Sequence, residues 1–594
     1  MEHCKAPPES IFASRPAAIC LTACLAVGAA LRLWGIHWGL PDETHLLSYH
    51  PDEFHSLRGA LAFIGDGDLN PHFFNYGSLY LYMVAFVCFW HSAVFGGPDL
   101  VAALLKGGTA HTQMAAWTMD ARLVVVVCAV LTVWVAWLIG HRLGGLAGAT
   151  AAGGLMAVLP LHVLNSHYAT VDVPQTLFIA ACVYFALDVA RRGSWRDYVL
   201  AGATAGLAAG VKYNGAAVLV APLVAHLLPL GAGHPGQENA RTEPEGAEAR
   251  SWLRVIGMLG AAGIAFAATC PYVILAWPEA WGHISFEIQH MRQGESPIRD
   301  VYPNGWLFHL HVSLLMAALA VLATRARARR ALMPVAFFGL VWFAMIGAAG
   351  VRYTRYELPL EPVAAVMGGV VLARVWEGFK GARRTVCLSV LILWAAGLTL
   401  VAAMDGAAKT RCNVRDAMLE RVLDSVGEGE ELAVLWDPWF NIAPIDYCNG
   451  GAALRSSPLL ARFCRPVRPI IVTSMDAAKL SDEAPRAVLV SDFELSGAYA
   501  SVSERHRAVW ELLWDSGRFG PPIRLEPRWA KLRWRHRPHW PALDSRYATP
   551  GLYLFIRADD DSGVGRPAAT EGGEQRRAVT RRPRQDYSRS AKGE

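Results

Sequence analysis

The sequence predicts a polytopic α-helical membrane protein with a smaller α/β region near its C-terminal end. Two observations predict this fold class. Apolar residues make up 53% of the 594-residue chain and charged residues only 18%, and the mean hydropathy is positive, at +0.26. The apolar residues gather in runs near the roughly 20 residues that cross a bilayer. These runs recur from residue 17 to residue 404 and then nearly stop.

The basic residues predict the topology, because Lys and Arg concentrate on the cytoplasmic side of membrane helices. Four clusters, near residues 142, 191–196, 325–330 and 374–384, can all be cytoplasmic if eleven segments cross the membrane. With eleven crossings the N-terminus is inside. The first apolar segment is expected to be a retained helix, because it lacks the cleavage pattern of a signal peptide. The predicted crossings are 17–37, 119–140, 145–164, 173–190, 198–211, 214–230, 253–276, 305–323, 331–350, 357–375 and 385–404.

The apolar segment 77–97 is expected not to cross, because one more crossing there would put every later arginine cluster outside. We expect a juxtamembrane or re-entrant helix on the outer side, and twelve crossings are the alternative. With eleven crossings, the polar turns of the membrane part gather on the outer face. They are the loop 38–118, the turn at Asp172, the turn 211–214, the loop 277–304 and the turn 352–362.

Several classes of protein and site are disfavoured by the remaining composition. The net charge of +5 is small, and the arginines lie beside apolar runs, which does not indicate a nucleic-acid binder. No P-loop motif occurs, and the series Gly202, Gly206 and Gly210 predicts a helix-packing face. The eleven cysteines have no zinc-like spacing. Two of Cys412, Cys448 and Cys464 could be bridged in an oxidising compartment.

The stretch HPDE at 50–53 lies in the first outer loop. Pro51 suits the first position of a helix, and Asp52 and Glu53 follow in the first turn, where carboxylates favour the positive end of the dipole. Apolar residues at 54, 57, 61 and 64 then predict an amphipathic helix on the membrane. Pro-Asp-Glu also occurs at 41–43, so a simple helix start is the alternative explanation for both copies.

Further polar residues lie at the outer ends of the crossing segments. Asp172 stands at the entry of one, where an acidic residue is costly and therefore functional by default. For each arginine, contact with a lipid headgroup is the alternative. Together they predict a site where a carboxylate takes a proton from an acceptor hydroxyl and cations stabilise a phosphate leaving group. The other candidates are Arg122, Lys212, Tyr213, Arg355 and Tyr356, with His50, Tyr76, Glu287 and His290 as acceptor or loop contacts.

The C-terminal part predicts a soluble α/β domain over 405–557. A helix-like stretch near 414–426 precedes strand-like segments at 431–436, 468–474, 486–492 and 551–557, with a further helix near 506–517. Residues 558–594 are charged and poor in apolar groups, which predicts a disordered tail. The membrane module is then 1–404.

The membrane part resembles the C-type glycosyltransferases that use lipid carriers, and specifically the dolichyl-phosphate-mannose protein mannosyltransferases of glycosyltransferase family 39. The resemblance extends over about the first 400 residues and rests on the order and spacing of short motifs. They are HPDE at 50–53, GDLNPHFFNYGSLYLY at 67–82, AR at 121–122, LPLHVLNSHYATVDVP at 159–174, GLAAGVKYN at 206–214, CPYVIL at 270–275 and RYELPLEP at 355–362.

The resemblance implies an integral membrane glycosyltransferase that moves a sugar, with inversion, from a polyprenyl-phosphate donor to a glycan, lipid or protein hydroxyl on the outer face of the cell membrane. Asp52 would be the base, with Glu53 beside it, and Asp172 would match the second acidic position. Asp52 and Asp172 could share a divalent metal ion or act without one. One departure is Gly77, where the family usually has a proline.

Two other classes of function stay open at this point. A secondary transporter or flippase of a glycolipid or envelope precursor would be expected to show internal repeats and ionisable residues at mid-membrane, whereas these charges gather at the outer edge. A non-catalytic scaffold would use the C-terminal domain to bind a partner.

Overall fold

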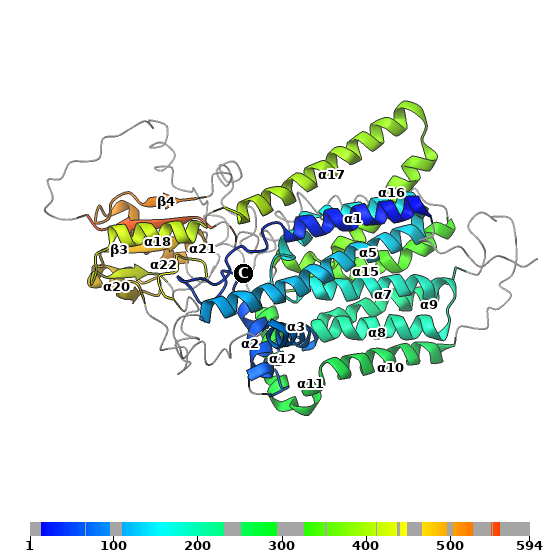
Figure 1. Ribbon diagram of the computed structural model, residues 1–594, viewed down its shortest axis with the longest axis horizontal. Coiled ribbons are helices and arrows are strands. Elements are labelled where there is room, and N and C mark those ends of the chain that lie inside the picture. Colours follow the sequence, from blue (N-terminus) through cyan, green and yellow to red (C-terminus); the bar gives the residue numbers. More distant parts are fainter. Residues whose placement is uncertain are drawn as a thin grey trace, which may run out of the picture.

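The computed structural model describes residues 14–65, 67–95, 110–230, 251–293, 326–350, 353–411, 413–435, 440–447, 466–495, 503–526, 548 and 550–558. Figure 1 shows a long bundle of helices with a small β-sheet region beyond one end of it. The predicted crossing 305–323, the three cysteines 412, 448 and 464, and residues 559–594 of the predicted tail lie outside the described residues.

The long helices of the bundle are formed by the apolar runs. Within the described ranges, α1, α5, α7, α10, α15 and α17 are long and apolar enough to cross a membrane, and the chain is a multi-pass integral membrane protein. The helices are α1 (Arg15–Leu33), α2 (Glu53–Gly65), α3 (Leu79–Phe95), α5 (Ala110–Val158), α6 (Pro160–Asn165), α7 (Asp172–Arg191), α8 (Trp195–Val211), η2 (Tyr213–Leu219), α9 (Val220–Leu227), α10 (Trp252–Thr269), α11 (Pro271–Leu275), α12 (Trp277–Gln293), α15 (Ala326–Ala348), η4 (Thr354–Glu357), α16 (Leu360–Gly378) and α17 (Gly381–Lys409).

The α5 element is a hairpin of two helices. The backbone leaves helical geometry at Gly144 and Gly145, and Gly145 has a φ of +59°, which glycine adopts without the strain of a side chain. The two halves then pack so closely that a Cβ on Gly140 would lie 2.5 Å from the carbonyl oxygen of Gly148. The chain therefore turns back within α5, as the two predicted crossings on either side of Gly144 require.

Glycines also allow α8 to lie against α10. A Cβ on Gly202 would lie 2.1 Å from the carbonyl oxygen of Met258, and one on Gly206 would lie 2.2 Å from that of Ala262. The predicted packing face of the glycine series is therefore confirmed.

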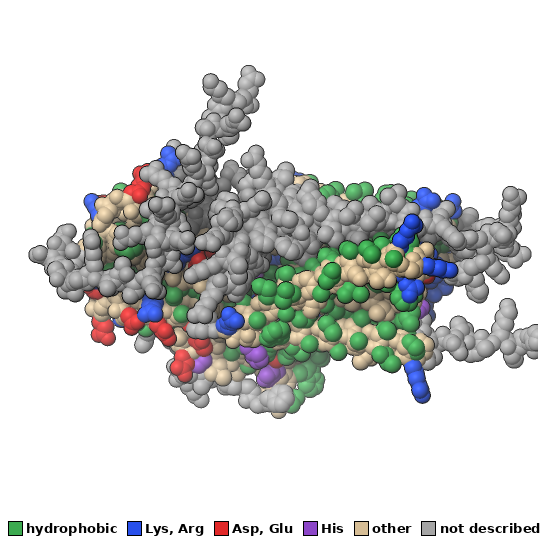
Figure 2. Space-filling view, turned by 90° about the horizontal axis from the view of Figure 1, so that it is seen from above, with side chains coloured by type: hydrophobic (Ala, Val, Ile, Leu, Met, Phe, Trp, Pro, Cys, Tyr) green, Lys and Arg blue, Asp and Glu red, His purple; other side chains and the backbone are tan. Residues whose placement is uncertain are grey.

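The two ends of the bundle differ in charge. At the basic end, Arg142 and Arg192 both pair with Asp188, at 2.7 and 3.0 Å. Figure 2 shows Lys and Arg side chains gathered at the end of the bundle away from the sheet, with Asp and Glu near the sheet. The residues 52, 172, 212 and 355 lie together at the opposite end, called the polar end below. The predicted separation of the two faces is thus present, and which compartment each faces stays a prediction.

Within the segment 77–97 the residues Leu79–Phe95 form α3, and α3 does not run through the bundle. At its start the Gly77 N–H donates to the Val211 carbonyl oxygen at 3.2 Å, and near its end Ser92 Oγ accepts from Trp117 Nε1 at 3.4 Å. Both contacts are at the polar end. The helix α2 also forms as predicted, and its Leu57 and Phe63 pack in one apolar cluster with residues of α3 and α5. The total of eleven crossings stays a prediction.

The C-terminal region is a small mixed sheet with helices. The strands are β1 (Leu432–Val434), β2 (Ile470–Val472), β3 (Ala487–Ser491), β4 (Ile523–Leu525) and β5 (Leu552–Ile556), in the order β2-β1-β3-β5-β4. The β1 strand pairs in parallel with β2 and β3, and β5 pairs antiparallel with β3 and β4. The helical elements are α18 (Val414–Ser425), α20 (Ala477–Glu483), α21 (Asp492–Leu495), α22 (Ser503–Trp510) and η7 (Glu511–Asp515).

The predicted elements of this region form, with two corrections. The four predicted strands are β1, β2, β3 and β5, whereas β4 was not predicted. The helix α17 continues past residue 404 to Lys409, so the predicted boundary falls inside a helix, and the α/β region begins near Asn413.

Candidate active site

Four charged side chains from separate parts of the chain meet at the polar end. Asp52 precedes α2, Asp172 begins α7, Lys212 follows α8, and Arg355 lies in η4. The guanidinium of Arg355 donates to Asp52 Oδ2, and its Nε lies 3.9 Å from Asp172 Oδ2. Lys212 Nζ donates to Asp172 Oδ1 at 2.8 Å. The predicted convergence of two acidic residues with two cations is therefore present in the structure.

Asp52 is the most accessible member of this charged cluster. Its side chain is 25% exposed, against 5% for Asp172, 10% for Arg355 and 14% for Lys212. Burial acts to raise the pKa of Asp52, but the charge of Arg355, its hydrogen bond and the nearby His50 and His55 together hold the pKa below the ordinary value of 3.8. At neutral pH the accessible group is therefore a carboxylate.

Tyrosine rings surround the two cations. Lys212 Nζ lies 4.5 Å from the ring centroid of Tyr356 and 5.5 Å from that of Tyr76, and the Arg355 guanidinium lies 4.7 Å from the ring of Tyr353. Such contacts attract a cation to the face of the ring. Burial raises the pKa of Tyr76 and of Tyr356 well above the ordinary value, so both phenols stay neutral. Tyr76 and Tyr356 thus lie beside the charged cluster, as expected.

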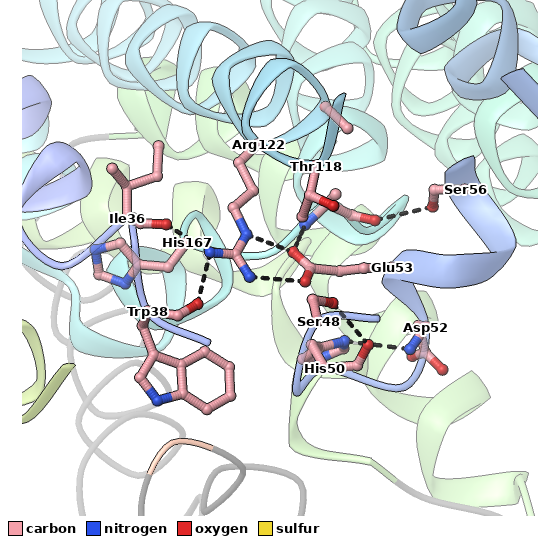
Figure 3. Close-up of polar contacts among 12 residues, drawn as sticks. Ile36, Trp38, Ser48, His50, Asp52, Glu53, Ser56, Thr118, Arg122 and His167 are labelled. Carbon is pink, nitrogen blue, oxygen red and sulfur yellow. Dashed lines mark hydrogen bonds and ion pairs between the residues drawn. The ribbon is translucent and has the colours of Figure 1, made fainter. Parts of the chain in front are cut away.

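Glu53 and Arg122 have a different place from the one expected. Arg122 Nε and Nη2 donate to the two carboxylate oxygens of Glu53, each at 2.7 Å, and Nη1 donates to the Trp38 carbonyl oxygen at 2.7 Å. Neither side chain is exposed. Figure 3 shows Glu53 turned toward Arg122 and Asp52 turned away from it. In this structure Glu53 and Arg122 are thus bonded to each other, and their expected roles in catalysis and donor binding stay predictions.

The Glu53–Arg122 pair fixes the start of α2. Glu53 Oε1 also accepts the Ala169 N–H at 2.7 Å, and Ser56 Oγ donates to the Ala169 carbonyl oxygen at 2.8 Å. These bonds connect the segment that carries Asp52 to the loop before Asp172. Burial of the two charges is compensated by this complete set of partners.

His50 lies directly behind Asp52. Its Nδ1 accepts the Asp52 N–H at 3.3 Å, and its ring stacks on Tyr168 with centroids 4.3 Å apart (Figure 3). Burial lowers the pKa of His50 to about 4, so the ring is neutral and its Nδ1 can accept. His50 therefore supports the backbone of Asp52, and its role as an acceptor contact stays a prediction.

Three other expected residues lie outside the charged cluster. Tyr213 donates its hydroxyl to the Phe74 carbonyl oxygen at 3.0 Å, and its role in donor binding stays a prediction. Glu287 accepts from Asn75 Nδ2 at 2.5 Å, and His290 is exposed and stacks on Phe286. Glu287 and His290 thus lie on the surface of α12, and their role as acceptor or loop contacts stays a prediction.

The helix α12 holds the loop that leads to Tyr76. Besides Glu287 with Asn75, Glu279 Oε1 lies 2.9 Å from His72 Nδ1, and His283 Nδ1 accepts the Phe74 N–H at 3.1 Å. These three side chains of α12 are spaced four residues apart, so they share one face of the helix. The loop therefore reaches the charged cluster with its course fixed.

Gly77, which follows this loop, is required by a close backbone contact. A Cβ at this position would lie 2.0 Å from the carbonyl oxygen of Gly210, and the Gly77 N–H bonds to Val211. A proline has a Cβ and no N–H. The contact therefore gives the physical reason for the glycine found here.

The side chains of the charged cluster give limited support to a bound metal ion. Among the described residues no group of three or more His, Cys, Asp or Glu side chains could hold one. Asp52 and Asp172 are both approached by Arg355. A divalent ion shared by the two carboxylates, as considered from the sequence, would have to displace this guanidinium.

Sequence reasoning missed two residues that shape the charged cluster. Gln175 Nε2 donates to the Lys212 carbonyl oxygen at 3.0 Å and to Asn214 Oδ1 at 2.7 Å, which fixes the turn that carries Lys212. Tyr168 supports His50. The position of Gln175, three residues after Asp172 on a helix, is the signal that could have indicated it.

Comparison with known proteins identifies one family. Residues 98–234, which include Arg122, Asp172 and Lys212, match the family model described as dolichyl-phosphate-mannose-protein mannosyltransferase. The family predicted from the sequence is thereby confirmed for this segment. No curated protein sequence matches the chain.

Solved structures show weaker likenesses. ArnT from Cupriavidus metallidurans in the apo state is 14% identical, with 81% of this chain and 95% of that chain covered and a TM-score of 0.48. The same protein bound to undecaprenyl phosphate is 14% identical, with coverage of 81% and 94% and a TM-score of 0.47. An Archaeoglobus fulgidus oligosaccharyltransferase tethered with an acceptor peptide is 13% identical, with coverage of 87% and 74% and a TM-score of 0.47.

Proposed function

The chain is a membrane glycosyltransferase of the lipid-phosphate-sugar-dependent kind, and we propose that it moves one sugar from a polyprenyl-phosphate carrier to a hydroxyl acceptor by direct displacement. The observation that carries the proposal is an accessible carboxylate, Asp52, bonded to a cation that a phosphate could also bind, Arg355. Direct displacement at the anomeric carbon inverts its configuration. The acceptor is a hydroxyl of a glycan, a lipid or a protein.

Arg355 and Lys212 are proposed to bind the phosphate of the donor. As the bond to the sugar breaks, the phosphate gains negative charge, and preorganised cations at that point lower the barrier. In the structure the charges of these cations are balanced by Asp52 and Asp172. An arriving phosphate therefore competes with the carboxylates for the same two cations.

Asp52 is proposed to be the general base. While Arg355 is bonded to it, its lowered pKa makes it a weak base. When a donor phosphate draws Arg355 away, the pKa of Asp52 rises, and the carboxylate becomes better able to take the proton of the acceptor hydroxyl. Binding of the donor thereby prepares the base, which favours transfer only when both substrates are present.

Asp172 is proposed to hold the two cations rather than to act on the substrate. It is nearly buried, it bonds to Lys212 at 2.8 Å, and it lies 3.9 Å from Arg355. A second carboxylate next to Asp52 also keeps the cations in place before the donor arrives. Arg122 and Glu53 act one step further away, by fixing the turn that carries Asp52.

The proposed location is the cell membrane, with the polar end and the α/β domain outside and the N-terminus inside. The test is mass spectrometry of envelope glycans and glycolipids from cells with the wild-type protein and with Asp52→Asn. One sugar missing from one class of molecule in the variant is the expected result, and it would identify both donor and acceptor. Unchanged glycans with normal amounts of inserted variant would contradict the proposal.

A further inference from the structure

The loop between α1 and α2 is held by the C-terminal region. Tyr49, which is 1% exposed, donates its hydroxyl to the carboxylate of Asp416 at the start of α18. The guanidinium of Arg415 lies 4.8 Å from the Tyr49 ring centroid and 5.7 Å from that of Trp38. The C-terminal region therefore binds this loop at its aromatic residues.

Separate parts of the C-terminal region take part in this contact. The Leu46 N–H donates to the Tyr447 carbonyl oxygen at 2.7 Å. Ala548 packs in one apolar cluster with Trp38, Tyr49 and Tyr168. Arg415 is fully buried, and its Nε donates to the Phe440 carbonyl oxygen at 2.5 Å. The contacts from 415–416, 440–447 and 548 together form a specific packed interface. A weak, non-specific contact would not bury an arginine together with its hydrogen-bond partner.

Both aromatic residues under Arg415 are connected to the base. Tyr49 directly precedes His50, which accepts the Asp52 N–H. Trp38 offers its carbonyl oxygen to Arg122, which holds Glu53. The C-terminal region is thus connected to the turn that carries Asp52 in two ways. One connection follows the chain from Tyr49 to His50, and the other passes from Trp38 to the buried Arg122–Glu53 ion pair.

We propose that Arg415 and Asp416 are positioning residues for the transfer reaction, and that the C-terminal region is a fixed part of the active site. This inference rests on the proposed function. It assigns the region a role in the geometry of Asp52, whereas an independent acceptor-binding or partner-binding module would leave the chemical step unchanged when its contact with Tyr49 is weakened.

The test uses the full-length purified protein with Tyr49→Phe and Asp416→Asn, which remove one hydrogen bond and keep the shape. The matched control is Arg421→Gln on the same helix, where the side chain is 57% exposed. We expect kcat to fall about tenfold with little change in KM for the donor, as for the loss of a hydrogen bond to a charged group. Hydrogen exchange of the peptide 46–57 should become faster in both variants and stay unchanged in the control.

The outcomes separate this inference from the proposed function. Normal kcat and unchanged exchange in both variants would overturn the positioning role. A lower kcat with unchanged exchange would also overturn it, because the effect would then not pass through the loop. If the wild-type protein transfers no sugar from any lipid-phosphate donor, the proposed function fails. The exchange of peptide 46–57 still decides, without any activity, whether the C-terminal region orders the turn at Asp52.

Discussion

Arg122 and Glu53 form a buried pair in which both carboxylate oxygens of Glu53 are bonded to the guanidinium, each at 2.7 Å. The two neighbouring acidic residues of HPDE therefore differ in kind, since Asp52 is accessible and Glu53 is not. The assignment of Asp52 as the base therefore assumes that Glu53 and Arg122 have a structural role.

Glu53→Gln should destabilise the protein, because it leaves the Arg122 charge buried with an incomplete set of partners. Removal of one partner from a buried pair costs about 3–5 kcal/mol. The measurement is the thermal unfolding midpoint in detergent, compared with that of Asp52→Asn, which should fall less because the Asp52–Arg355 pair is partly exposed. A Glu53→Gln protein with a normal midpoint and no activity would instead indicate a chemical role for Glu53.

Lys212→Met should impair both binding and the chemical step, because Lys212 would contact the donor phosphate before and during bond cleavage. Loss of one such charge-stabilising group costs about 10²–10³-fold in kcat. Lys212→Arg keeps the charge and should recover part of the rate. Kinetics with a purified lipid-phosphate sugar give the values, and equal rates for the Met and Arg variants would exclude this role of the charge.

Gly77→Ala should disrupt the polar end, because its Cβ would meet the Gly210 carbonyl oxygen at 2.0 Å. The backbone of the loop or of α8 must then move, and Tyr76 and Lys212 move with it. The matched control is Gly263→Ala in α10, where nothing lies within 4 Å of the added Cβ. Activity and the unfolding midpoint should fall only in the first variant, and a normal Gly77→Ala protein would refute the close contact.

The pH dependence follows from Asp52 and His50. The pKa of Asp52 is lowered, so its ion pair with Arg355 stabilises the fold above about pH 3.8 and is lost as the pH falls through the folded-state value. The pKa of His50 is lowered from 6.5 to about 4, so the unfolded state binds a proton first and stability declines as the pH falls from 6.5 toward 4. His50→Phe keeps the stacked ring without the titration, and its unfolding midpoint should fall less over that range. An equal decline in both proteins would show that His50 is not the group responsible.

The charged cluster could be predicted from the sequence because each member lies at a turn on one side of the predicted topology. Asp172, Lys212 and Arg355 are at the ends of predicted crossing segments, which puts them on the same side of the predicted topology as Asp52. The partner of Glu53 could not be predicted, because nothing in HPDE distinguishes the environments of the two adjacent carboxylates. The difference comes from Arg122, which lies on another helix. Likewise β4 has three residues, one of them Arg524, and gives too short an apolar pattern to detect.

The contact of Arg415 and Asp416 with Tyr49 was also outside the reach of the sequence. Each lies in an ordinary helical or loop pattern, and the contact joins residues that are 367 positions apart in the chain. Only the folded structure brings the C-terminal region to the turn before α2.

The most direct test of the central claim compares Asp52→Asn with Asp42→Asn, the matching residue of the first Pro-Asp-Glu copy. Asp42 is 52% exposed and bonds only locally, to Thr44 and His45, in the contacts found for it. The measurement is sugar transfer from a purified polyprenyl-phosphate donor by equally folded variants. The account predicts that Asp52→Asn abolishes transfer and that Asp42→Asn keeps it, and retained transfer in Asp52→Asn would contradict the assignment of Asp52 as the base.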